Sequence, residues 1–154
     1  MPEATKQEMS KLFSELTDRA VLVAPTKDAE TKAKQMYGVY NVLPDNNTIV
    51  VKVDMPLLGS FAGSLLGLPS ASIKDLLAEV PIEETLRDAM HEFLNISATL
   101  VETKGRAVFE TMTVDPKTCR EEAAQLLKKP TRKSSFDITI SGYLGGKMTI
   151  LSQL

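Results

Sequence analysis

The sequence has 154 residues, of which 43% are hydrophobic and 25% charged, and this is the size and composition of one compact domain over residues 1–154. Its net charge of −2 is too near balance for a protein that binds nucleic acid through a basic surface. No hydrophobic run approaches the roughly 20 residues of a membrane span, and the first residues lack a secretory leader, so we expect a cytoplasmic protein.

The first part of the sequence predicts a helix followed by three strands. Residues 3–18 repeat hydrophobic side chains at steps of three and four, as an amphipathic helix does. Residues 19–25 are short, apolar and stopped by a proline, which favours a strand. After a polar stretch, residues 35–43 and 48–55 are rich in strand-forming residues and are separated by turn-forming ones. These two segments predict an antiparallel hairpin.

The middle of the sequence predicts three helices. Residues 56–68 begin with proline and carry a row of glycines spaced by four: Gly59, Gly63 and Gly67. We expect this glycine row to allow close packing, either within the fold or across a dimer. Ser70 or Ser72 is expected to cap a further helix, which runs to residue 80. Pro81 is then expected to open the longest helix, at residues 81–101.

The last part of the sequence predicts a strand, a helix and a second hairpin. Residues 106–114 alternate as a strand does, and residues 118–128 have acidic residues early and lysines late, as the helix dipole prefers. The basic segment 128–133 lies within or beside a predicted turn and is interpreted as a solvated loop, although it could also contact a phosphate or an acidic partner. Residues 136–143 and 147–151 form the hairpin around a glycine turn. Together the elements predict an α+β fold with a mainly antiparallel sheet of about six strands.

The longest predicted helix carries the most promising polar residues. At about 100° per residue, Asp88, Glu92 and Asn95 lie on one face of the helix. The opposite side is apolar and is predicted to cover the core: Leu86, Ala89, Met90, Phe93, Ile96, Leu100 and Val101. The two carboxylates and the amide are therefore expected to point outward. That arrangement suits a docking or catalytic surface, and it equally suits an ordinary solvated helix face.

Other reactive residues are weaker candidates. A single cysteine permits no internal disulfide, and one histidine excludes a metal site built from cysteine and histidine clusters. Cys119 has only His91 as a potential imidazole partner, so it is interpreted as a bystander thiol. His91 lies between Asp88 and Glu92 in the sequence and is a weak candidate for a role on this face.

The amide distinguishes this face from a plain pair of acids. Asn95 can hold a water molecule by donating and accepting hydrogen bonds, while Glu92 contacts a cation on a partner. Such an arrangement suits the attack of water on a phosphoryl group that another protein's metal has already activated. That reaction needs mainly positioning and charge stabilisation.

The order Asp88, Glu92, Asn95 and then Pro116 resembles the signature of the CheC, CheX and FliY chemotaxis phosphatases, which dephosphorylate the response regulator CheY. The N-terminal helix, the hairpin that leads into a Met-Pro helix and the closing glycine-turn hairpin are also similar to CheX. The resemblance implies a CheC-like fold. A single motif of this kind in the chain is similar to CheX, whose members form homodimers.

The resemblance also implies a role for each motif residue. Asn95 would orient the attacking water at the aspartyl phosphate of a CheY-like receiver, and Glu92 would pair with the receiver's active-site lysine. Asp88 and Pro116 would be supporting positions. This chain would bind no cofactor of its own, because the receiver would supply Mg²⁺.

Two features depart from the family pattern. Thr99 stands four residues after the motif asparagine, where the family usually has glycine, and is expected to share the face of Asn95. The interval from Asn95 to Pro116 is slightly shorter than is usual. The favoured interpretation is a CheX-like phosphatase. The alternatives are a non-catalytic module of the same fold that binds a signalling partner, and a helix face that is merely solvated.

Overall fold

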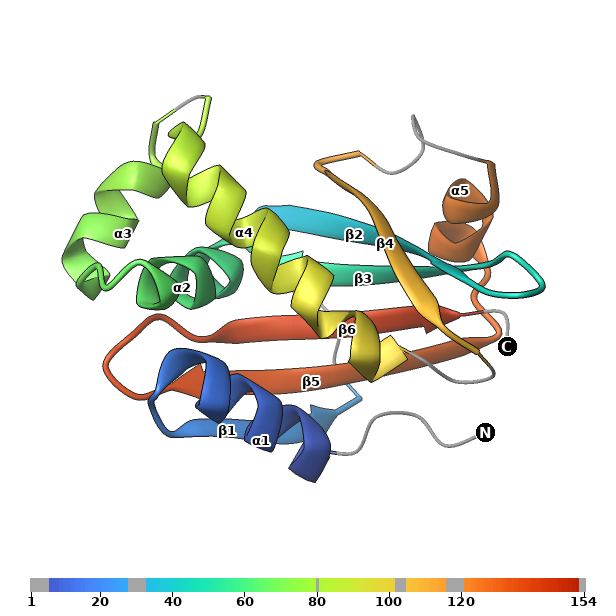
Figure 1. Cartoon of the computed structure of the whole chain (residues 1–154), viewed down its shortest axis with the longest axis horizontal. Coiled ribbons are helices and arrows are strands. Elements are labelled where there is room, and N and C mark those ends of the chain that lie inside the picture. The colour runs from blue at the N-terminus through green and yellow to red at the C-terminus, as the bar shows by residue number, and fades with distance from the viewer. Residues whose placement is uncertain (1–5, 28–32, 80, 102–104, 116–120, 153–154) are drawn as a thin grey trace.

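The computed structural model describes residues 6–27, 33–79, 81–101, 105–115 and 121–152. These residues form a six-stranded sheet in the order β1-β5-β6-β3-β2-β4 (Figure 1). The strands are β1 (Val21–Thr26), β2 (Gln35–Val42), β3 (Asn47–Asp54), β4 (Ala107–Thr113), β5 (Arg132–Ile140) and β6 (Gly146–Ser152). Every neighbouring pair is antiparallel. The predicted α+β fold with a mainly antiparallel sheet is confirmed.

The helices cover the two faces of the sheet unequally. They are α1 (Lys6–Thr17), α2 (Met55–Leu65), α3 (Ser70–Leu77), α4 (Glu84–Ile96), the 3₁₀ helix η1 (Ser97–Val101) and α5 (Glu121–Lys128). The main core joins α1, α2 and α4 to one face of the sheet, whereas Ala123 and Leu126 of α5 pack against Val39 and Val50 on the other face. In Figure 1, α4 crosses the sheet diagonally above its strands. No helix within the described ranges is long and apolar enough to cross a membrane.

Three phenylalanine rings in mutual contact join the helices of the main core. The ring centroids of Phe13 and Phe61 lie 4.8 Å apart, and those of Phe61 and Phe93 lie 4.2 Å apart. All three side chains are fully buried. Aromatic pairs at these separations add to the free energy that burial of their surface supplies. The cluster therefore fixes α1, α2 and α4 relative to one another.

Both predicted hairpins are confirmed, with one correction. The β2–β3 ladder closes with Val42 opposite Asn47. Strand β5 begins within the basic segment 128–133, which was predicted to be a loop. This prediction was wrong for the end of the segment, because Arg132 and Lys133 pair with residues of β6. Their side chains are exposed, so the two residues extend the backbone ladder while their charges remain in water.

The glycine row of α2 packs within the fold, as expected. A Cβ atom at Gly59 would lie 2.8 Å from Leu77, and one at Gly63 would overlap the side chain of Ile73. Both contacts are made by α3, so the absence of side chains on α2 lets α3 approach closely. Gly67 has a different role, because it follows the helix with a φ of +73°.

Helix α3 begins differently from the prediction. Pro69 occupies the position before the helix, and neither Ser70 nor Ser72 provides the expected cap. The Pro69 backbone is extended, with φ of −73° and ψ of 157°, and its carbonyl accepts hydrogen bonds from the amides of Ser72 and Ile73. The prediction of a serine cap was wrong because Pro69 already takes the half-helical position that a capping residue needs.

Candidate functional site

Helix α4 begins at Glu84, three residues after the predicted start at Pro81. The carboxylate of Glu83 accepts a hydrogen bond from the Leu86 amide at 3.0 Å. The pKa of Glu83 is lowered because the backbone amides of Thr85 and Leu86 favour its charged form. A side-chain acceptor satisfies an amide at the helix start, which Pro81 cannot do. The helix therefore starts where its cap is.

The end of the predicted helix also differs. Residues Ser97–Val101 form the 3₁₀ helix η1, and the Ser97 hydroxyl donates to the Phe93 carbonyl at 2.8 Å. A 3₁₀ helix turns about 120° per residue, against about 100° in an α-helix. Thr99 is exposed, but this change of pitch turns it further from the line of Asn95 than a continuous helix would. The prediction of one unbroken helix to Val101 was therefore wrong.

The inward side of α4 is fixed firmly to the sheet. Leu86, Met90 and Phe93 are fully buried. The Tyr40 hydroxyl of β2 donates a hydrogen bond of 2.6 Å to the Leu94 carbonyl, and burial raises the pKa of this hydroxyl. Leu94 is fully buried as well, although the predicted apolar stripe did not include it. It lies at the flank of that stripe, where helical periodicity alone does not separate buried from exposed positions.

The outward side of α4 carries the predicted polar residues. Asp88, Glu92 and Asn95 are all exposed, as expected. Because they are spaced by four and three residues in one α-helix, neighbouring Cβ atoms of the set lie about 5–6 Å apart. A convex, exposed helix face cannot enclose a reacting group. Any chemistry on this face requires a partner that brings the reactive group and covers it from water.

Strand β4 runs beside this face. The His91 ring meets Phe109 of β4 edge-on, with centroids 4.6 Å apart and planes at 71°. Phe109 in turn contacts Tyr40 at 5.3 Å. His91 thus joins α4 to the sheet edge. Strand β4 leads toward Pro116, which lies outside the described residues, as does Cys119, so the expectations for these two residues remain predictions.

None of the described residues form a cluster of three or more His, Cys, Asp or Glu side chains that could hold a metal ion. The polar face of α4 offers two carboxylates and one amide instead. Such a set can pair with a cation and orient a water molecule. It does not itself supply an electrophile.

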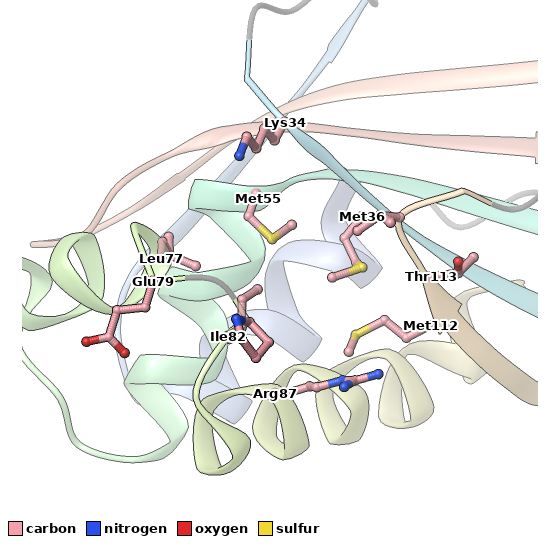
Figure 2. A pocket seen from close by; sticks show the side chains of 11 residues that line it. Lys34, Met36, Met55, Leu77, Glu79, Ile82, Arg87, Met112 and Thr113 are labelled. Atoms are coloured by element: carbon pink, nitrogen blue, oxygen red, sulfur yellow. The ribbon is translucent and has the colours of Figure 1, made fainter.

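A pocket near the start of α4 was not predicted. It has a volume of about 390 Å³ and lies between the beginnings of α2 and α4, the end of α3, the start of β2 and the end of β4. Figure 2 shows the side chains of Met36, Met55 and Met112 pointing toward one another inside it. These methionines are far apart in the sequence, and no spacing rule brings them together. The pocket could therefore be predicted only by someone who already knew the order of the strands in the sheet.

Neither a protein-family model nor a curated protein matches the sequence. Solved structures do match. The FliM middle domain from H. pylori has a TM-score of 0.51 and 16% identity, over 96% of this chain and 84% of that chain, and a chain of a FliG–FliM complex from H. pylori has a TM-score of 0.57 and 14% identity, over 97% and 87%. Thermotoga maritima FliY has a TM-score of 0.49 and 13% identity, over 93% and 81%. A chain of the CheX-CheY-BeF3-Mg²⁺ complex from Borrelia burgdorferi has a TM-score of 0.47 and 8% identity, over 94% and 92%.

These similarities define a class of fold. The FliM match establishes that the chain has the fold of the FliM middle domain, and at 14% identity it establishes the fold alone. Structures of FliY and CheX are among the other matches. The α+β architecture with a mainly antiparallel sheet, which was predicted from the sequence, is therefore one that the chain shares with the FliM middle domain.

Proposed function

We propose that this chain docks on a CheY-like response regulator through the outward face of α4 and hydrolyses the regulator's aspartyl phosphate. The observation that carries the proposal is the exposure of Asp88, Glu92 and Asn95 on one face of a helix whose other face is buried. The spacing of these residues is that of the phosphatase signature. Their exposure satisfies the geometric requirement of that signature, since the partner must reach all of them.

In the proposed reaction, the carboxylate of Glu92 pairs with the lysine of the receiver's active site. The amide of Asn95 holds a water molecule in line with the bond between phosphorus and the aspartyl oxygen. Water forms the new bond to phosphorus, the aspartyl oxygen leaves as a carboxylate, and the proton of the water passes to phosphate or solvent. Mg²⁺ supplied by the receiver stabilises the charge on the phosphoryl oxygens.

The anchoring of α4 supports this mechanism. A positioned amide accelerates hydrolysis only if its orientation is fixed before the reaction, because reorganisation at the moment of reaction would cost free energy. The hydrogen bond from Tyr40 to the Leu94 carbonyl ends one residue before Asn95. Phe93, two residues before Asn95, is stacked on Phe61. The backbone that carries the amide is therefore held by the sheet and by α2.

Phosphate loss from a panel of purified CheY-like receivers tests this proposal. Each receiver is phosphorylated with acetyl phosphate and Mg²⁺, and its decay is followed with the wild type, Glu92→Gln and Asn95→Ala. The exposed Glu15 of α1 supplies the control variant Glu15→Gln. We expect Asn95→Ala to reduce the added rate by about 10²-fold, comparable to the loss of one positioned donor, and Glu15→Gln to change nothing. Equal rates for all four proteins would reject the proposal.

A second candidate function is a binding module without catalysis. It is favoured by the FliM similarity, since FliM is seen in complexes with FliG and with SpeE. In this case the chain binds a receiver and leaves the lifetime of its phosphate unchanged. Isothermal titration with the same receivers, in the presence of beryllium fluoride and Mg²⁺ to mimic the phosphoryl group, separates the two functions. Binding that is weakened by Glu92→Gln, without faster phosphate loss from the wild type, would establish the second one.

A further inference from the structure

The pocket at the start of α4 has an apolar interior of unusual composition. Met36 and Met55 are buried, with 6% and 8% of their surfaces exposed, and Leu77 and Met112 are half-buried. Figure 2 shows the three methionine side chains meeting across the same space. Methionine is flexible and polarisable, so this lining can adapt to apolar ligands of different shapes. The volume of about 390 Å³ falls in the range of small-molecule sites.

Two cations and one carboxylate stand at the rim of the pocket. Lys34 and Arg87 line it on opposite sides of the methionines in Figure 2, and the carboxylate of Glu79, the one acid among the described lining residues, points away from the methionines. Neither the Lys34 ammonium nor the Arg87 guanidinium has a side-chain partner among the described residues. The Thr113 hydroxyl is already engaged, because it contacts the carbonyl and the amide of Asp115 at 3.3 and 3.1 Å. Two cations beside an apolar space remain for a ligand.

From this arrangement we propose that the pocket binds a small amphipathic carboxylate, with its hydrocarbon body among the methionines and its anionic head at one of the two cations, Lys34 or Arg87. A sugar or nucleotide would leave many hydroxyl and amide groups unpaired against this lining, which is unfavourable. A hydrocarbon chain has no polar groups to leave unpaired there, and the burial of its apolar surface favours binding. This inference is independent of the phosphatase proposal, because it uses none of Asp88, Glu92 and Asn95.

Methyl NMR of the methionines provides a local test. The chain has seven methionines, of which three line the pocket and three others, Met9, Met90 and Met148, are buried in the core and are not among the lining residues. Octanoate is titrated into full-length protein labelled at the methionine methyl groups, below its critical micelle concentration, alongside octanol and octylamine. We expect saturable shifts of the Met36, Met55 and Met112 methyl signals, while the signals of the three core methionines stay in place.

The head-group preference tests the chemical class. Octanoate is expected to bind about threefold more tightly than octanol, which is the scale of a partly exposed charge pair, and octylamine more weakly than either. The double variant Lys34→Gln/Arg87→Gln is expected to remove this preference and to leave octanol binding unchanged. Lys74→Gln, an exposed lysine of α3 that does not line the pocket, is the control and should retain the preference.

Filling the pocket provides a second, independent variant. Met112→Trp places a larger side chain in the space at a half-buried position of an edge strand, and it should abolish the shifts of Met36 and Met55. The double charge variant keeps the proposal testable if this protein does not fold. The proposal is overturned if no methyl signal shifts in the wild type, if core and pocket methyl signals shift together, or if octanol and octylamine bind as well as octanoate.

Discussion

The two sides of α4 differ in what their residues do. On the inward side, Met90 and Phe93 are fully buried and contribute to the core. On the outward side, Glu92 and Asn95 are exposed, and Glu92 is the direct neighbour of Phe93 in the chain. Side chains on the inward side determine where the helix lies, whereas those on the outward side determine what the helix offers to a partner. The residues that stabilise the fold therefore differ from those that a partner can contact, although both sets lie in the same two turns of α4.

The largest effect is expected for Phe93→Ala, which tests the inward side. The substitution removes a ring stacked on Phe61 and leaves a cavity among the core aromatics, so we expect a loss of about 3–5 kcal/mol in the free energy of unfolding. Urea denaturation measures it. Asn95→Ala, two residues later on the exposed side, should change stability by no more than about 0.5 kcal/mol. Comparable losses for both variants would show that the two sides are not separable.

A smaller effect is expected for Tyr40→Phe, which tests the link between the sheet and the helix. The variant keeps the ring but leaves the buried Leu94 carbonyl without its hydrogen bond, at a cost of about 1–3 kcal/mol. Hydrogen exchange of the α4 amides, together with urea denaturation, measures the loss. Tyr143→Phe is the control, since it also removes a hydroxyl bond to a carbonyl, that of Leu68, which does not belong to α4. Only Tyr40→Phe should increase exchange along α4.

The smallest effect is expected at the start of the helix and depends on pH. The folded-state pKa of Glu83 lies below its ordinary value of 4.5, so its charged form stabilises the folded chain. This contribution is present above the ordinary value and is lost as the pH falls through the lowered folded-state pKa. The thermal midpoints of the wild type and Glu83→Gln should therefore converge in acid. Glu84→Gln, which removes an exposed neighbour outside the cap, should not reproduce this convergence.

Local patterns predicted much of this molecule because they report on single elements. The strand-forming residues on either side of a turn in residues 35–55 were sufficient to predict the β2–β3 hairpin. The spacing of three and four residues in the central helix correctly predicted that Phe93 is buried and Asn95 exposed. The errors lie at helix ends, where one hydrogen bond decides the boundary. Because the Glu83 carboxylate caps α4, the helix starts later than predicted. Because a 3₁₀ helix begins at Ser97, Thr99 lies further from the line of Asn95 than predicted.

Contacts between distant segments were outside the reach of such patterns. The Tyr40 hydroxyl and the Leu94 carbonyl are 54 positions apart, and no periodicity in either segment identifies the other. The methionine pocket is a stronger example, since its lining comes from five elements and their loops. The polar face of α4 was predictable because it belongs to one helix. The pocket was not, because it is a product of the strand order.

That strand order also has a consequence for how the chain folds. Strand β1 pairs only with β5, and β3 pairs with β6 as well as with β2, so the closing β5–β6 hairpin joins the first strand to the rest of the sheet. During synthesis β1 has no partner strand until β5 has emerged, and the two strands lie near opposite ends of the described sequence. Such long-range pairing slows folding and prolongs exposure to aggregation. We expect the last hairpin to set the rate at which the native sheet forms.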